Sequence, residues 1–191
     1  MIQVFDTGAA RRALDRRLLR CPDCREPLKP WGRTRERTVR GRGGTKATFR
    51  PDRGRCTGCD ATHVILGANL LPGRAYAAGL IGTALLSSAR GRGHRAVARE
   101  AGVPEGTVRG WIRRARRSAE QLRVIGVRAV VTLDQDALPV RVLADPLACA
   151  LDALGAAAMA MGRRLGLQDT DPWARIVVLT RGRLLRLAPD S

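Results

Sequence analysis

Apolar residues after about residue 70 recur at the spacing of amphipathic helices. Between residues 108 and 122 they follow an i, i+3, i+4, i+7 pattern, which predicts a helix that begins near Pro104. The same spacing predicts a helix from about residue 74 to residue 90 and another over residues 146–165. This part of the chain is therefore expected to be mainly helical.

The preceding segment alternates polar and apolar residues and predicts short strands. "TRERTVRG" ends in a glycine-rich turn at residues 41–44, "TKATFRPDRGR" can return from that turn, and "THVIL" can form another strand. Few apolar residues are available to form their core: Val39, Phe49, Val64, Ile65 and Trp31. So small a core could not order about 40 residues without another source of stability.

Four cysteines at these strands offer that source. Cys21/Cys24 and Cys56/Cys59 are two CxxC pairs, and such pairs can place four thiolates around one tetrahedral, structural Zn²⁺ ion. Metal binding contributes about 10–16 kcal/mol to the folding of small zinc modules. With four thiolates the site is closed and leaves no position for a catalytic water molecule.

Other interpretations of these residues remain open. A dithiol redox pair usually needs a CxxC on a helix of a larger α/β domain, and that pattern is absent. His63 could replace one sulfur ligand, although a strand-edge histidine is the simpler interpretation. Cys149 lies in an apolar segment and is most simply a core residue.

The charge is strongly positive and unevenly distributed. The formal net charge is +18 and the pI is about 11.6. Residues 1–123 hold 27 basic and 10 acidic side chains, whereas residues 124–191 hold 8 and 7. A merely solvated surface usually mixes the two signs more evenly, so we expect the basic region to bind a polyanion, namely nucleic acid.

The stretch "GHRAVAREAGVPEGTVRGWIRRARR" fits a helix-turn-helix. Ala98 is small where two helices would cross, Gly102 can adopt the left-handed turn, and apolar Val103 follows it. The apolar face of the second helix then includes Val108 and Trp111. A plain helical hairpin is the alternative, but it does not require this placement of small and apolar residues.

The opposite face of that second helix is expected to contact DNA. Its candidate contact residues are Thr107, Arg109, Arg113, Arg114, Arg116 and Arg117. Arg109 and Arg113 are the best candidates for base edges, because arginine can grip guanine with two hydrogen bonds. Thr107 is a secondary candidate, and the other three arginines are expected to meet phosphates. Gly106 and Gly110 cost helix stability, about 1 kcal/mol each, but allow close approach to a groove.

Together, "CPDC…CTGC", "THVILGANLLP" and the helix-turn-helix stretch resemble the N-terminal half of bacterial insertion-sequence transposases, which recognise element ends. The chain is more similar still to short actinobacterial transposase-like proteins that have a zinc ribbon followed by a helix-turn-helix. The resemblance covers roughly residues 20–122. It implies DNA recognition through these two modules.

The chain departs from a full transposase in its last part. Only 69 residues follow Leu122, too few for a ribonuclease-H-like nuclease with three metal-binding carboxylates, so we expect no enzyme activity. Tyr76, the only tyrosine, lies in an apparent scaffold helix, which argues against a tyrosine recombinase. Neither His63 nor His94 has an evident nucleophile partner for catalysis. Six acidic residues are expected to be solvated or to cap helices, with a stray metal site as the alternative: Asp134, Asp136, Asp145, Asp152, Asp169 and Asp171.

These patterns predict an α+β chain. Its expected parts are an N-terminal extension (1–19), a zinc ribbon (20–70), a three-helix helix-turn-helix domain (71–123) and a C-terminal helix/hairpin unit (124–191). The last hairpin is predicted from "ARIVVLTRGRLLRLAP", with its turn near Arg181-Gly182. Residues 146–165 either pack on the helix-turn-helix or form a homodimer.

No signal peptide and no membrane-spanning apolar run is apparent, so a cytoplasmic, nucleoid-associated location without membrane contact is expected. The function predicted is sequence-specific binding of double-stranded DNA, by a transcriptional regulator or a transposase-derived recognition protein. A partial transposase with a catalytic partner and an RNA- or protein-interaction module are the alternatives.

Overall fold

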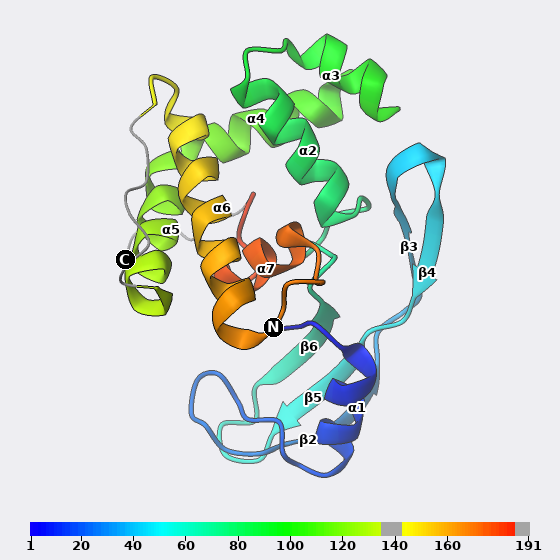
Figure 1. Cartoon of the computed structure of the whole chain (residues 1–191). Helices are drawn as coiled ribbons and strands as arrows, with labels where there is room; N and C mark the ends of the chain where they lie inside the picture. Colours follow the sequence, from blue (N-terminus) through cyan, green and yellow to red (C-terminus); the bar gives the residue numbers. More distant parts are fainter. Residues whose placement is uncertain (135–142, 186–191) are drawn as a thin grey trace.

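The computed structural model describes residues 1–134 and 143–185 and has a mixed α+β architecture (Figure 1). Strands gather in the first 67 residues, and helices form most of the described chain after Gly67. The predicted α+β class is confirmed at this level.

A four-stranded sheet with the order β1-β6-β5-β2 organises the N-terminal part. Its strands are β1 (Ile2–Val4), β2 (Leu28–Arg33), β5 (Asp52–Cys56) and β6 (Thr62–Gly67). β1 runs parallel to β6, and the other neighbours are antiparallel. Helix α1 (Thr7–Asp15) begins after Asp6, whose carboxylate accepts hydrogen bonds from the N–H groups of Gly8 and Ala9.

Residues 1–19, expected to be an extension, are part of this unit. Ile2 is paired with Ile65 in the β1–β6 register. Leu14 of α1 is only 1% exposed and packs in one cluster with Leu28 and Ile65. The cluster also holds Cys21 and Cys56, so the N-terminal residues complete the small core beside the cysteine pairs.

Two further strands, β3 (Arg37–Arg40) and β4 (Lys46–Phe49), form a separate two-stranded sheet. A short 3-10 turn, η1 (Arg42–Gly44), joins them, which confirms the turn predicted at residues 41–44. Val39 is buried against Leu66 and Leu70. Trp31, by contrast, is 43% exposed, and the expectation that it fills the core is wrong: its ring lies under the guanidinium group of Arg55, 4.7 Å from the ring centre.

The remaining described elements are all helices: α2 (Ala78–Ala89), α3 (His94–Ala101), α4 (Glu105–Arg117), α5 (Ala119–Leu133), α6 (Pro146–Leu165) and α7 (Pro172–Leu179). The helix predicted over 74–90 is present but begins at Ala78, and α6 has the bounds predicted for it. The helix expected to continue through Leu122 ends at Arg117, and α5 begins after a break at Ser118. All six helices contribute to one continuous apolar core.

The β-hairpin predicted over residues 174–189 is wrong, because its first part is helical. The run "ARIVV" lies in helix α7, which begins after Asp171, whose carboxylate accepts the N–H of Trp173, and has Pro172 in its first turn. β-branched residues favour strands only weakly, and burial of Ile176 and Val177 in the helical core overrides that preference. The turn at Arg181-Gly182 is real, with both φ angles positive. Residues 186–189 of the expected hairpin lie outside the described residues.

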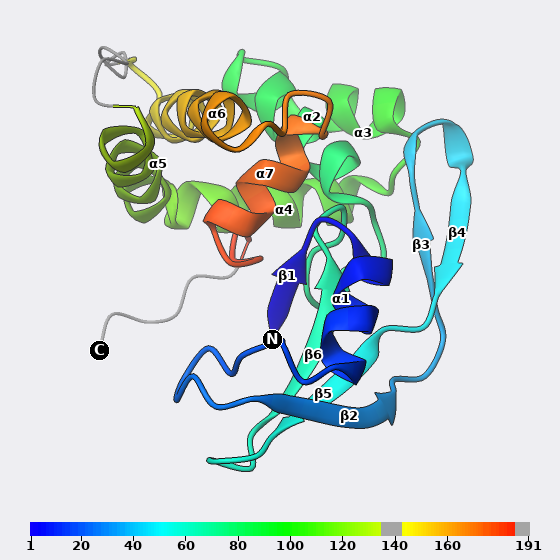
Figure 2. The same ribbon diagram turned by 60° about the horizontal axis from the view of Figure 1, so that its bottom comes forward.

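The apolar face of α6 is covered within the same chain. Leu147, Leu151 and Leu154 are buried in the common core, where α6 packs along α5 and α7 (Figures 1 and 2). Met159 and Leu165 are the large apolar residues of α6 that stay exposed. This burial favours packing as the role of residues 146–165, and the homodimer stays a prediction.

Candidate metal centre and nucleic-acid interface

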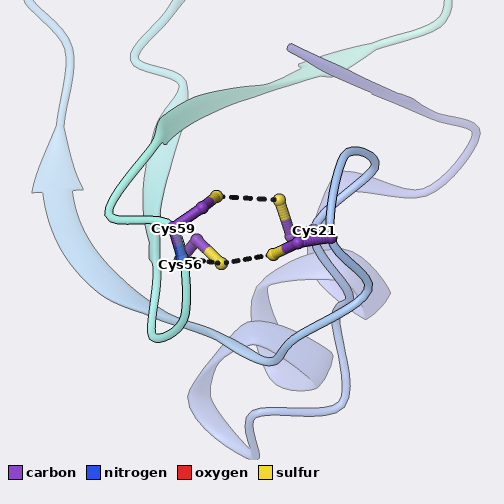
Figure 3. Close-up of side chains that lie close together, drawn as sticks. Cys21, Cys56 and Cys59 are labelled. Carbon is purple, nitrogen blue, oxygen red and sulfur yellow. Dashed lines mark hydrogen bonds between the residues drawn. The ribbon is translucent and has the colours of Figure 1, made fainter.

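The four cysteines of the two CxxC pairs converge at one end of the N-terminal sheet. Their sulfur atoms all lie within 4.8 Å of one another. The Sγ atoms of Cys21 and Cys59 are 3.8 Å apart (Figure 3). Those of Cys24 and Cys56 are 3.3 Å apart. Sulfur atoms about 2.3 Å from a tetrahedral ion are about 3.8 Å from each other. The four cysteines could therefore hold a metal ion, as the sequence predicts.

Backbone N–H groups lower the pKa of two of the four thiols, those of Cys56 and Cys21. The N–H groups of Cys59 and Gly58 both point at Cys56 Sγ from 3.4 Å, and they lower the pKa of Cys56 to about 7. The N–H groups of Cys24 and Asp23 likewise lower the pKa of Cys21. These two sulfurs, one from each pair, are the first of the four expected to lose a proton as the pH rises.

The other two thiols, those of Cys59 and Cys24, have raised pKa values because neighbouring cysteine thiols surround them. The N–H of Ala61 lowers the pKa of Cys59. The thiols of Cys24 and Cys56 outweigh it and raise that pKa to about 12. The pKa of Cys24 is also raised, against the N–H of Glu26, by the neighbouring thiol of Cys56. Four negative charges so close together need a cation between them.

His63 of β6 lies beside the centre, and sequence reasoning underestimated its burial. The residue is only 5% exposed, and its Nε2 atom is 3.4 Å from Cys21 Sγ and 3.8 Å from an Asp23 oxygen. With Cys21 and Asp23 it forms a second group that could hold a metal ion. It is therefore a buried neighbour of one cysteine rather than an ordinary histidine at a strand edge.

The second candidate site rests on the packing of α3 against α4. Val97, Ala98, Val108 and Trp111 are all buried, as their positions in the sequence predict. Gly102 ends α3 with φ 63° and ψ 35°, a left-handed conformation that favours glycine. The ring of Trp111 meets that of Tyr76 edge-on at 5.2 Å. The buried residues fix which face of α4 points outward.

The outward face of α4 is basic. Arg109, Arg113, Arg116 and Arg117 are exposed, whereas Arg114 is half-buried and folds back to donate to the carbonyl oxygen of Gly110 at 3.2 Å. Thr107 is half-buried. The structure therefore places four of the six predicted contact residues in solvent and holds Arg114 and Thr107 closer to the helix surface.

A cleft of about 760 Å³ opens along this face, between α4 and the start of α3. No described acidic residue lines it, and its lining includes five arginines and one histidine: Arg92, His94, Arg109, Arg113, Arg116 and Arg117. Sequence reasoning missed Arg92 and His94. They precede α4 by more than ten residues, and only the turn between the helices brings them beside it.

Several of the candidate acidic residues have structural roles. Asp145 and Asp171 cap the N-termini of α6 and α7, as expected. Asp134 pairs with Arg163 at 2.6 Å. Asp136 lies outside the described residues. Cys149 is buried in α6, which confirms its expected place in the core.

Within the ranges 1–134 and 143–185, no helix combines the length and apolar character that crossing a membrane requires. Searches of curated proteins and of solved structures found no match to the chain. One family model does match, over residues 21–111, and it is described as a domain of unknown function, DUF6431. The match begins at Cys21 and ends at Trp111, so it covers all four cysteines of the candidate metal centre but stops before Arg113, Arg116 and Arg117 of the α4 face.

Proposed function

We propose that this protein binds specific double-stranded DNA sequences through a zinc ribbon followed by a helix-turn-helix. In this proposal Cys21, Cys24, Cys56 and Cys59 hold one structural Zn²⁺ ion, and α2, α3 and α4 form the DNA-reading domain. Zinc fits the donor set, because four thiolates in a tetrahedral arrangement are typical of closed zinc sites. The protein would act as a transcriptional regulator or as a transposase-derived recognition protein.

The observation that carries the proposal is the outward face of α4. The buried contacts of Val108 and Trp111 leave exposed arginines on the opposite side, beside a cleft that no described acidic residue lines. A second helix of such a pair fits the major groove of DNA, where its side chains reach base edges. Two of the arginines that line the cleft are ion-paired, Arg92 with Glu100 and Arg116 with Asp145. Arg109, Arg113 and Arg117 therefore supply most of the positive charge that the described cleft offers to DNA.

The arginines of α4 are expected to contact two different parts of the DNA, the base edges and the phosphates. Arg109 and Arg113 lie one helical turn apart on the exposed face, which suits the reading of neighbouring base pairs. Arg116 and Arg117 follow at the C-terminal end of α4, where phosphate contacts are expected. Arg114 is a phosphate candidate too, but it would first have to release the Gly110 carbonyl.

Selection of bound fragments from random duplex DNA tests this proposal. An enriched motif supports specific recognition, and the absence of any motif at moderate salt argues against it. Competition with duplex RNA of the same length separates the RNA-binding alternative. Incubation of the selected duplex with Mg²⁺ or Mn²⁺ separates the transposase alternative, because cleavage would require catalytic residues that the proposal does not include.

Arg109→Ala should weaken binding to the selected duplex by about 1–3 kcal/mol and binding to unrelated DNA by less. The reason is that a base contact is worth most on its own base pair. Fluorescence anisotropy on both duplexes measures the difference. Arg164→Ala is the matched control, an exposed arginine on α6, and it should change neither value. Equal losses on both duplexes would show that Arg109 contacts a phosphate instead.

Gly106→Ala should stabilise the protein but weaken DNA binding. A Cβ atom at Gly106 would meet no described atom within 4 Å, so alanine adds only helix propensity, about 0.5–1 kcal/mol. The same methyl group would stand on the face that is proposed to approach DNA. Thermal melting and anisotropy measure the two effects. Unchanged DNA affinity would remove close approach as the reason for this glycine.

A further inference from the structure

The two-stranded sheet of β3 and β4, with its turn η1, carries only positive charge. We call residues 37–50 the β3–β4 arm. Its five charged side chains are all basic: Arg37, Arg40, Arg42, Lys46 and Arg50. Glu36 and Asp52 flank the arm, but no acidic residue lies within it. Nothing in the proposed action of α4 accounts for this charge.

The register of the arm makes the charge unfavourable for folding. Arg40 is paired directly with Lys46, and Thr38 with Thr48. Like charges directly opposite one another destabilise a two-stranded sheet. Because side chains alternate along a strand, these four residues share the outer face, while Val39 on the inner face packs against Leu66 and Leu70. Stability alone does not explain a cationic pair on the outer face.

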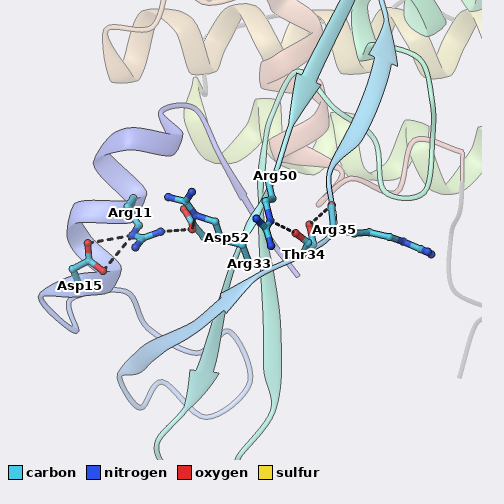
Figure 4. A network of polar contacts seen from close by, with 7 residues as sticks. All are labelled: Arg11, Asp15, Arg33, Thr34, Arg35, Arg50 and Asp52. Carbon is cyan, nitrogen blue, oxygen red and sulfur yellow. Dashed lines mark hydrogen bonds and ion pairs between the residues drawn. The ribbon is translucent and has the colours of Figure 1, made fainter.

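The arm's cations have no counter-charge within the described part of the chain. None of the five forms an ion pair with a described residue. Arg40 contacts the ring and hydroxyl group of Tyr76, and Arg50 donates to the carbonyl oxygen of Thr34 at 2.9 Å. The nearby carboxylate of Asp52 is already held by Arg11 and Arg33 (Figure 4). The charge of the arm is thus left for an outside partner.

The arm is fixed against the helical part of the molecule. The Arg40 N–H donates to the Ala75 carbonyl oxygen, and the Ala77 N–H donates to the Arg40 carbonyl oxygen, both at 2.9 Å. At the tip, the Arg42 guanidinium group bonds the Thr83 hydroxyl group of α2. A groove lined by Arg42, Thr83 and residues of α3 runs between them. The arm therefore stands beside α2 and α3 (Figures 1 and 2).

We propose that the β3–β4 arm is a second DNA-contacting element, in which Arg40, Arg42 and Lys46 bind phosphates that flank the site read by α4. This inference rests on the proposed function. A polyanion relieves the repulsion between Arg40 and Lys46. The major groove of B-DNA, about 12 Å wide, also admits a two-stranded sheet, whereas the major groove of duplex RNA is too narrow for side chains to read. Phosphate contacts add affinity without sequence preference.

The double variant Arg40→Gln/Lys46→Gln tests the arm. Its melting temperature should be unchanged or higher, because the repulsive pair is gone. Its affinity should fall about 10- to 60-fold at 0.1 M salt, equally on selected and unrelated duplexes. The slope of log K against log salt concentration should become shallower by about 1.8, since two phosphate contacts are lost. Arg164→Gln/Arg183→Gln removes the same charge from exposed positions after α5 and should leave the slope unchanged.

The outcomes separate this inference from the proposed function. If the unaltered protein binds no duplex DNA, both are wrong. If it binds a selected duplex and the arm variant keeps both affinity and salt slope, only the arm is wrong. An equal loss in the control variant would mean that net charge, not the arm, sets the affinity, and would also overturn the inference. If duplex RNA protects the amide hydrogens of the arm from exchange more strongly than duplex DNA does, the inference is overturned as well.

Discussion

Cys56→Ser should abolish metal binding and unfold the N-terminal sheet. Cys56 is buried at the end of β5, and its sulfur, with a pKa of about 7, is one of the two that ionise first. The core around it is small, six buried residues of which two are cysteines. A structural zinc ion contributes about 10–16 kcal/mol, as much as the whole stability of a typical domain. The unit should not survive without it.

Metal content and local order measure this outcome separately. Elemental analysis should give about one zinc per unaltered chain and none for the variant. Amide hydrogen exchange should show lost protection in residues 20–70, with protection retained in the helices. Cys149→Ser is the matched control, because Cys149 is buried in α6 away from the centre, and it should keep the metal. A Cys56→Ser chain that retains one zinc and a protected sheet would disprove the metal centre.

The cysteine centre could be predicted from sequence because its signal is local. Each CxxC pair positions two sulfurs through one turn, so spacing alone indicates the ligands. The surroundings of the centre depend on contacts distant in sequence. Pairing of Ile2 with Ile65, and the approach of His63 to Cys21, become visible only once β6 has joined β1 and β5. For that reason the sequence pattern alone indicates no more than an extension at residues 1–19.

In the helical part, too, features set by neighbouring residues could be predicted from sequence, whereas features set by distant contacts could not. The buried positions around Gly102 follow from short-range periodicity, and the structure confirms them. The pattern predicts a strand where helix α7 forms, because "RIVVL" is rich in β-branched residues and only its burial against the other helices decides its conformation. The basic cleft beside α4 depends on the placement of Arg92 and His94, which periodicity within one helix cannot give.

Gly126→Val should strongly destabilise the helical core. Gly126 is a buried residue of α5 that packs against Ala153 and Leu154 of α6. A Cβ atom there would come within 2.6 Å of the carbonyl carbon of Ala153 and 2.8 Å of the Leu154 nitrogen. These are backbone atoms, so the helices must move apart, and Leu122 and Leu154 would lose the packing that now buries both completely. We expect a loss of at least about 3 kcal/mol in the free energy of unfolding.

Gly155→Ala is the matched control on the facing helix. A Cβ atom at Gly155 would meet no described atom within 4 Å, so alanine should raise the free energy of unfolding by about 0.5–1 kcal/mol. Urea denaturation followed by helical circular dichroism gives both values. If Gly126→Val unfolds at the same urea concentration as the unaltered protein, α5 and α6 do not pack as described. Because α4 shares their core, the same loss of packing should also displace the face of α4 that is proposed to read DNA, even though Gly126 lies on a different helix.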